Sequence, residues 1–155
     1  MSFVPFVSSP HEVVRKMLEL ARVGPDDTLY DLGCGDARIL VVAAEEFGVK
    51  RAVGYEIRSD IYKTALQTIE KHNLMDRVKI INEDLYNADL SDATVITLYL
   101  TTSANERLKP KLEKEVPHGA RIVSHDFSMG SWKHAWKEKL SDHTIYLYVT
   151  PNSFE

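Results

Sequence analysis

The chain has 155 residues, of which 44% are hydrophobic and 27% charged, and its formal net charge is −4. This fits one soluble domain with a real core, and the acidic balance argues against a protein that coats nucleic acid. No apolar run reaches the roughly 18 residues of a membrane span, and the single cysteine, Cys34, excludes an internal disulfide.

We expect a cytoplasmic monomer that forms one domain over residues 1–155. A lone cysteine fits a reducing compartment, and the start of the chain lacks the basic residues and long apolar run of a signal peptide. Residues 1–8 are expected to form an extended arm, which could close over a ligand as a lid or could cover an edge of the sheet.

Hydrophobic periodicity predicts helices and strands that alternate along the chain. Helices are expected after Ser9, over 37–47, from Ser59 to Asn73 and after Ser103. The expected strands are residues 28–32, 51–57, 77–81, 93–100, 120–127, 136–140 and 143–150.

Helix boundaries are predicted from capping residues. Ser9, Ser59 and Ser103 are expected to cap the helices that follow them, and Ser9 and Ser103 each precede a glutamate by three residues, as in a capping box. Gly24 is expected to end the first helix, and Pro110 to break or kink the last one.

This order of elements predicts an α/β, Rossmann-like, doubly wound fold. The sheet should be mostly parallel and seven-stranded, with helices on both faces and an antiparallel C-terminal strand. Residues 93–100 are almost all apolar or β-branched, as in a central parallel strand. Ligands of such folds bind at the carboxyl ends of the strands, so functional residues should directly follow strands.

The loop after the first strand, YDLGCGDAR, favours a cationic ligand over a dinucleotide. Gly33 and Gly35 fit the start of the dinucleotide fingerprint, but Arg38 occupies the place of its third glycine, and Asp31 would repel a pyrophosphate. S-adenosylmethionine carries a sulfonium and an ammonium, so Asp31 could attract the ammonium while the glycines let the backbone approach. Cys34 is expected to be a small buried residue.

Two further acidic positions follow the next two strands. A carboxylate at Glu56 could accept both ribose hydroxyls, and the neighbouring Ile57 could pack on adenine. Asp84 could accept from the adenine amino group while the amide of Leu85 donates to a ring nitrogen. Glu56 alone would also fit a NAD enzyme, so the combination of the three loops carries the prediction.

Together with residues 3–21, 95–112 and 121–127, these motifs resemble class I S-adenosylmethionine-dependent methyltransferases. More narrowly, the chain resembles the small archaeal protein-lysine methyltransferases, whose relatives include the mitochondrial lysine methyltransferases acting on ATP synthase subunit c and the adenine nucleotide carrier. The resemblance covers nearly the whole chain.

The resemblance implies a Rossmann-like fold, S-adenosylmethionine as the methyl donor, and N-methylation of lysine side chains in proteins. It also implies cofactor roles for Asp31, Gly33, Gly35, Glu56 and Asp84. The family's loop usually continues G-D-G-R, whereas Ala37 replaces the last glycine here. A methyl group at that position is expected only if φ is negative.

The binding site for the methyl acceptor is expected at the end of the fourth strand. Tyr99 is the candidate for the wall that orients the amine, and Asn105 could hydrogen-bond nearby. Residues 124–126, after the fifth strand, could line the same mouth. The histidines are scattered without ligand spacing, so no metal is predicted. The Asn/Asp-Pro-Pro-Tyr motif of many base-modifying methyltransferases is absent, which makes nucleic acid an unfavoured partner.

The sequence leaves three functions open. The favoured one is a methyltransferase whose partners are proteins that present lysine. The alternatives are a methyltransferase that acts on RNA or a small molecule, and a protein that binds the cofactor without catalysis.

Overall fold

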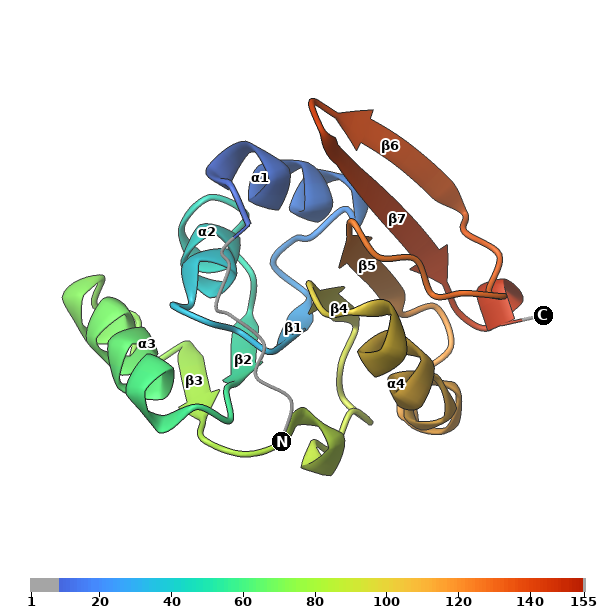
Figure 1. The fold of residues 1–155 in the computed structure, drawn as a ribbon. Coiled ribbons are helices and arrows are strands. Elements are labelled where there is room, and N and C mark those ends of the chain that lie inside the picture. Colours follow the sequence, from blue (N-terminus) through green and yellow to red (C-terminus); the bar gives the residue numbers. More distant parts are fainter. Residues whose placement is uncertain (1–8, 155) are drawn as a thin grey trace.

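The computed structural model describes residues 9–154, which form one seven-stranded sheet with helices on both faces (Figure 1). The strands lie in the order β3-β2-β1-β4-β5-β7-β6. Their bounds are Thr28–Leu32 (β1), Arg51–Tyr55 (β2), Val78–Ile81 (β3), Val95–Leu98 (β4), Arg121–His125 (β5), Trp136–Leu140 (β6) and His143–Val149 (β7). The helices are His11–Leu20 (α1), Arg38–Glu45 (α2), Ser59–Lys71 (α3) and Thr102–Glu115 (α4), with short 3₁₀ turns at Leu85–Asn87 (η1) and Asn152–Phe154 (η2).

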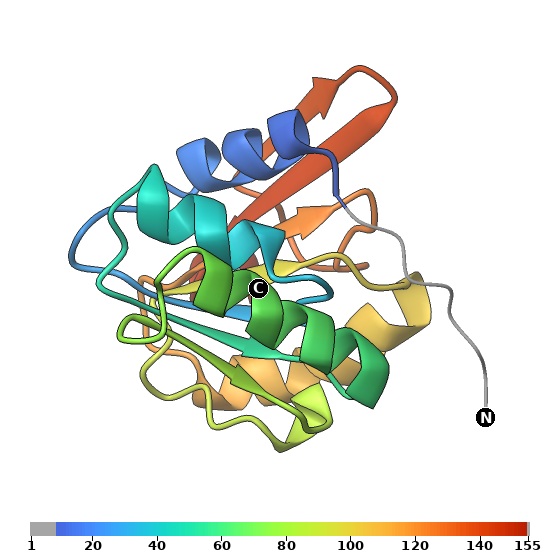
Figure 2. The same ribbon diagram turned by 90° about the vertical axis from the view of Figure 1, so that its left-hand side faces the viewer.

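The predicted fold class is confirmed. Strands β1 to β5 pair in parallel, and β7 runs antiparallel to both β5 and β6. The four residues of β4 are all buried, as a central strand between two parallel neighbours requires. Figure 2 shows the β6–β7 hairpin rising beside α1 at one edge of the molecule.

Two apolar cores cover the two faces of the sheet. The buried side chains of α1, α2 and α3 form the first core, which includes Met17, Leu40 and Ile69. The second core lies beneath α4, where Leu108 and Leu112 meet the other face of the sheet. Each helix therefore buries one apolar stripe against a central sheet that is apolar on both sides.

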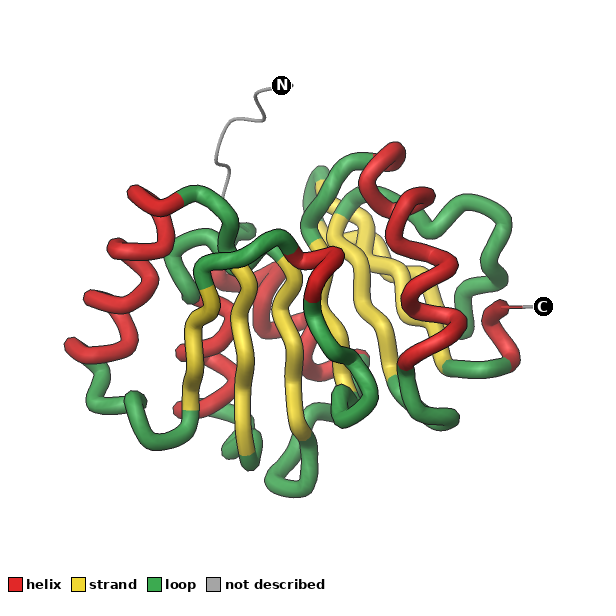
Figure 3. Tube along the Cα trace, turned by 90° about the horizontal axis from the view of Figure 1, so that it is seen from below, coloured by secondary structure: helices red, strands yellow, loops and turns green. Residues whose placement is uncertain are grey.

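The strand order reverses between β1 and β4, because β2 and β3 extend the sheet to one side of β1 while β4 and β5 extend it to the other. Figure 3 shows the parallel strands side by side with the connecting loops at their ends. The loops after β1 and β4 separate at this switch point, so a crevice opens above the carboxyl ends of the strands.

All three predicted serine caps are wrong. α1 begins one residue later than a Ser9 cap requires, and the Ser9 hydroxyl instead pairs with the buried His125. Ser59 is the first residue of α3 and its hydroxyl donates to Asn82 Oδ1. α4 begins before Ser103, and the hydroxyl of Thr101 accepts from the amide of Ala104. In each case a tertiary partner or an earlier hydroxyl replaces the local cap.

Two expected helix breakers act differently from the prediction. α1 ends at Leu20, four residues before Gly24. The backbone turns away from the helix at Arg22, which adopts a left-handed φ of 54°. The break expected at Pro110 is wrong, because α4 continues through this residue to Glu115 with Leu108 and Leu112 buried against the sheet, while the kink stays a prediction. The other strands and helices lie within a few residues of their predicted bounds.

The predicted N-terminal arm, residues 1–8, lies outside the described residues. Within residues 9–154, no helix combines the length and apolarity needed to cross a membrane.

Candidate functional site

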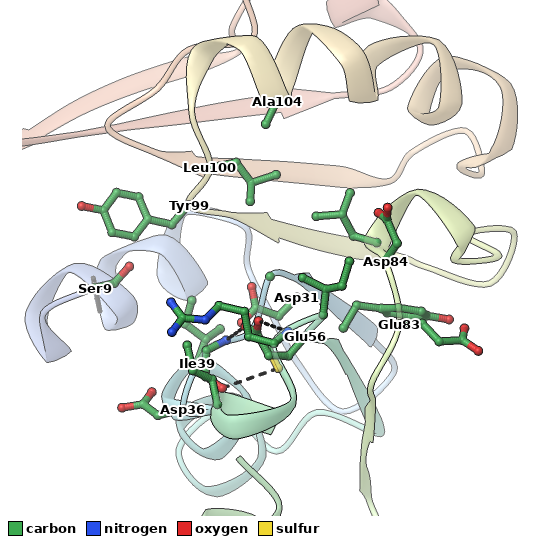
Figure 4. Close-up of a pocket in the computed structure, with 18 of the residues that line it drawn as sticks. Ser9, Asp31, Asp36, Ile39, Glu56, Glu83, Asp84, Tyr99, Leu100 and Ala104 are labelled. Carbon is green, nitrogen blue, oxygen red and sulfur yellow. Dashed lines mark hydrogen bonds between the residues drawn. The ribbon is translucent and has the colours of Figure 1, made fainter. Parts of the chain in front are cut away.

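A pocket of about 600 Å³ lies over the carboxyl ends of the parallel strands. This volume lies within the range of small-molecule sites. Figure 4 shows Asp31 and Glu56 together near its centre, Glu83 and Asp84 on one side and Tyr99 on the other. Every predicted cofactor residue lines it: Asp31, Gly33, Gly35, Glu56, Ile57, Asp84 and Leu85.

The floor of the pocket is the glycine loop after β1. Gly33 has a φ of +87°, and the amides of Gly33 and Cys34 both donate to the Tyr55 carbonyl, which ties the loop to the end of β2. Cys34 is buried against Gly54, where an added Cβ would lie 2.8 Å from its Sγ atom. Burial raises the pKa of the Cys34 thiol, so this cysteine is a packing residue, as expected.

The expectation of a negative φ at Ala37 is wrong. Ala37 precedes α2 with a φ of +71°, in the left-handed region, and its methyl group is buried. Left-handed backbone costs a non-glycine residue about 1–2 kcal/mol, so the surrounding core holds this residue in a strained conformation.

Arg38 does not obstruct the loop, because its side chain turns along the pocket wall. Its guanidinium pairs with Asp36 at 2.7 Å and donates to the Ser9 carbonyl at 3.1 Å. Although partial burial opposes ionisation, the hydrogen bonds from Arg38 hold the pKa of Asp36 below its usual range. Arg38 thus neutralises one loop carboxylate and fastens the loop to the segment before α1.

Asp31 is the most perturbed acid of the site. Its side chain is 3% exposed, and the hydroxyl of Thr97 donates to its Oδ1 atom at 2.9 Å. Burial raises the pKa of Asp31 to about 8, the charges of Glu56 and Asp36 add to this rise, and the Thr97 hydrogen bond opposes it. A carboxyl group in this state favours a positively charged ligand, because a cation would stabilise its ionised form.

Glu56 is fixed by two backbone amides. Its Oε1 atom accepts from Gly35 at 3.0 Å and its Oε2 atom accepts from Arg58 at 3.1 Å. Each carboxylate oxygen has further acceptor capacity, so two ligand hydroxyls could still bind. Ile57 is 62% exposed beside it, which leaves an apolar face open to the pocket.

The loop after β3 closes one end of the pocket. Asp84 precedes η1 and its Oδ1 atom accepts from the Tyr86 amide at 3.0 Å. The Tyr86 hydroxyl in turn donates to the Ala104 carbonyl of α4. These bonds connect Asp84 and Leu85 with α4, so the ends of β3 and β4 hold the pocket between them.

Tyr99, directly after β4, walls the other end of the pocket. Its ring stacks on His125 with centroids 4.0 Å apart, and Phe127 lies next to it. Burial raises the pKa of Tyr99, so its hydroxyl stays protonated at neutral pH. Phe127 lines the pocket, whereas residues 124–126 do not, contrary to the expectation that they would line its mouth.

Asn105 is fully buried and does not line the pocket. Its Nδ2 atom donates to the carbonyls of Phe127 and Ser128 at 3.2 Å each. Asn105 therefore holds the loop that carries Phe127 and acts on the pocket only through that loop.

Sequence reasoning missed several residues of the site. Thr97 could have been predicted from the sequence, because it is the polar residue of an otherwise apolar strand. The sheet register places it opposite Asp31. Ser9 and Phe127 carried none, because their positions depend on how distant segments pack. The fold also gathers His125, Asp126 and His143, although they have no ligand spacing in the sequence.

The sequence matches one family model, described as the ANTKMT methyltransferase domain, over residues 31–139. A protein-lysine N-methyltransferase of Saccharolobus islandicus is 49% identical over 150 residues, which cover 94% of this chain and 93% of that protein. The adenine nucleotide translocase lysine N-methyltransferase of Mus musculus is 33% identical over 84% of this chain. This chain spans about half the length of that mouse protein, 56% of which is covered.

A solved structure is also similar over nearly the whole chain. It is described as an RNA methyltransferase from Salinibacter ruber in complex with S-adenosyl-L-homocysteine. The two chains share 43% identity with a TM-score of 0.91, and the match covers 94% of each.

Proposed function

The chain belongs to the ANTKMT methyltransferase domain family and is an S-adenosylmethionine-dependent methyltransferase, and we propose that it methylates the ε-amino group of lysine in proteins. The observation that carries the proposal is the acidic pocket at the switch point, which ends at an aromatic wall formed by Tyr99 and Phe127.

The order of the strands supports an assignment of the pocket's parts. The loops after β3 and β2 carry Asp84, Leu85 and Ile57, which offer an acidic acceptor, a backbone amide and an apolar face for adenine. Glu56, at the end of β2, stands where it can accept the ribose hydroxyls. The loop after β1, with Gly33 and Gly35, would then contact the methionine part of S-adenosylmethionine.

The charge of the pocket fits this cofactor better than a dinucleotide. Five carboxyl groups and two guanidinium groups line the pocket, and both guanidinium groups are paired with carboxylates, Arg38 with Asp36 and Arg58 with Asp60. A diphosphate would meet uncompensated carboxylates here, whereas a sulfonium and an ammonium would be attracted. The Asp31 carboxyl group is positioned to bind the ammonium directly or through water.

The acceptor end must present an uncharged amine. Freeing the lone pair of lysine at pH 7 costs about 4–5 kcal/mol for a pKa near 10.4. The rings of Tyr99 and Phe127 exclude water from this end and thereby disfavour the ammonium form. The Tyr99 hydroxyl can then orient the amine, and S-adenosylmethionine supplies a methyl group bound to a positively charged sulfur, ready for in-line displacement.

RNA is the second candidate acceptor, because the Salinibacter ruber structure is described as an RNA methyltransferase. The net charge of −4 and the acidic pocket favour an amine-bearing protein over a polyanion. We also propose that the protein acts as a monomer and lies in the cytoplasm; the single cysteine, which fits a reducing compartment, supports the location only.

The test uses radiolabelled S-adenosylmethionine with a protein mixture, the same mixture after chemical acetylation of its lysines, and total RNA. We expect label in the untreated proteins that resists nuclease and disappears after acetylation. Glu56→Gln should abolish the labelling, while Glu46→Gln, which changes an acid outside the pocket, should not. Label that transfers only to RNA would assign the second candidate, and cofactor binding without transfer to protein would overturn the proposal of lysine methylation.

A further inference from the structure

Three metal-ligating side chains converge behind the acceptor end of the pocket. The Nε2 atom of His125 lies 2.8 Å from Nδ1 of His143, and the Oδ2 atom of Asp126 lies 3.3 Å and 3.2 Å from these two nitrogens. His125 is fully buried at the end of β5, whereas Asp126 and His143 are each 27% exposed. Of the three side chains, His125 is therefore shielded from solvent, whereas Asp126 and His143 are partly exposed to it.

The three side chains form one hydrogen-bonded cluster. Nδ1 of His143 is the shared atom, since it pairs with both His125 Nε2 and Asp126 Oδ2, so a single ring N–H can serve both contacts. Because the three ligand atoms all lie within 4.8 Å of one another, they could instead direct their lone pairs at one shared cation.

We propose that His125, Asp126 and His143 form a binding site for a divalent transition-metal ion, for which Zn²⁺ is the best match. Imidazole nitrogen and carboxylate oxygen are usual ligands of this ion, and bonds of about 2.0–2.2 Å hold ligand atoms about 3.2–3.5 Å apart. Two sides of the triangle formed by the three ligand atoms already have this length, so only the two histidines must separate slightly. The exposed side leaves room for water as a fourth ligand.

Two further observations support a built site. The second ring nitrogen of His125, Nδ1, is hydrogen-bonded to the Ser9 hydroxyl at 2.8 Å, which fixes the ring as outer partners of metal-bound histidines do. Asp126 has a φ of +64°, which is strained for a residue other than glycine, and its other carboxylate oxygen accepts from the Thr144 amide at 3.0 Å. The strain aims Oδ2 of Asp126 at the two histidines.

The site would fasten together three distant parts of the chain. Ser9 precedes α1, His125 ends β5 and Asp126 follows it, and His143 begins β7. Because the Tyr99 ring stacks on His125, an ion here would also fix the support of the acceptor wall. The site is structural in this proposal and takes no part in methyl transfer.

The test is metal binding by the tag-free, chelator-treated full chain. Zn²⁺ is titrated against a chromogenic competitor, bound metal is counted by mass spectrometry, and Co²⁺ is used as a spectroscopic substitute. We expect one Zn²⁺ per chain, a rise in the melting temperature with added Zn²⁺, and visible absorption bands with Co²⁺. His143→Gln and Asp126→Asn should each weaken binding at least about tenfold.

The matched control is His72→Gln, which changes an exposed histidine whose Nδ1 atom lies 3.1 Å from Glu45. This variant should bind Zn²⁺ like the unaltered chain. Asparagine tolerates left-handed backbone, so Asp126→Asn tests the ligand without disturbing the turn. Failure of the unaltered chain to bind Zn²⁺ at micromolar concentrations, or equal binding by all three variants, would overturn the proposal and leave the methyltransferase assignment untouched.

Discussion

Asp31 on β1 and Thr97 on β4 stand opposite each other in the sheet register, and the Thr97 hydroxyl donates a 2.9 Å hydrogen bond to Asp31 Oδ1. This bond joins the two strands at the point where the strand order reverses. It also partly offsets the burial that raises the pKa of Asp31 to about 8. The pair therefore influences the charge of Asp31, one of the five carboxyl groups of the pocket, at neutral pH.

The affinity for S-adenosylmethionine should rise with pH below the pKa of Asp31. The ligand's cationic groups favour the carboxylate, so binding below pH 8 must release the proton of Asp31. We expect the dissociation constant to fall up to about tenfold per pH unit between pH 5.5 and 7.5, below the range in which the ligand's α-amino group titrates. Calorimetry in buffers of different ionisation enthalpy will count the released proton.

Thr97→Val should shift this pH profile upward, because it removes the one hydrogen bond that lowers the pKa of Asp31. The matched control is Thr94→Val, since the Thr94 hydroxyl donates to Asp27 just before the same two strands begin, away from the pocket. A pH-independent affinity, or equal profiles for both variants, would remove Asp31 from the recognition of the cation.

Asp31→Asn should stabilise the cofactor-free protein while it weakens binding. A folded-state pKa above the unfolded value means that the unfolded chain binds fewer protons between pH 4 and 8, so stability falls as pH rises through this window. We expect a gain in the free energy of unfolding on the order of 1–3 kcal/mol at pH 8, measured by urea denaturation. No gain at pH 8, or the same gain at pH 4, would contradict this account.

The fold was predictable from the sequence because the local residue pattern of each segment indicates a strand. The β4 run is apolar throughout, and the β6 strand was predicted with its observed bounds, Trp136–Leu140. The residues that line the pocket were also predictable, since parallel strands bring the residues that follow them to one edge of the sheet, while their roles in cofactor binding stay a prediction. This rule alone places Asp31, Glu56 and Asp84 in one pocket.

What the sequence could not supply depends on pairs that are distant along the chain. Ser9 looked like a helix cap because its local sequence fits one, but its hydroxyl is bound by His125, 116 residues away. Ala37 looked compatible only with a negative φ, yet the buried contacts of its methyl group hold it in the left-handed region. Local propensity is outweighed in both cases by tertiary packing.

Gly33→Ala should weaken cofactor binding and destabilise the fold. Its φ of +87° is unfavourable for alanine, and the new Cβ would lie 3.1 Å from the Leu100 side chain in the pocket. We expect a loss of about 1–2 kcal/mol of stability from the backbone conformation, with a clear rise in the cofactor's dissociation constant. Gly24→Ala is the control, because nothing lies within 4 Å of its added Cβ. Equal effects of both substitutions would show that the loop tolerates a side chain.

Asn105→Ala should act through the loop that it holds. The substitution leaves the carbonyls of Phe127 and Ser128 without their donor, which costs about 1–3 kcal/mol of stability. We expect the KM for the acceptor to rise while the cofactor's dissociation constant stays the same, because we propose that Phe127 contacts the acceptor and not the cofactor. Asn87→Ala, at an exposed position, should change neither quantity. A fall in kcat with an unchanged KM would instead give Asn105 a direct role in the chemistry.

Tyr99→Phe should lower turnover more than binding. The substitution keeps the ring that stacks on His125 and removes only the hydroxyl that we propose orients the acceptor amine. Losing one such hydrogen bond in the transition state should lower kcat about tenfold, while the cofactor's dissociation constant stays within about twofold, since we propose that the loops after β1 to β3 bind the cofactor. Tyr62→Phe, on α3 and outside the pocket, is the control. Initial rates at saturating cofactor, combined with calorimetry, separate the two quantities, and an equal loss in both would remove Tyr99 from the chemical step.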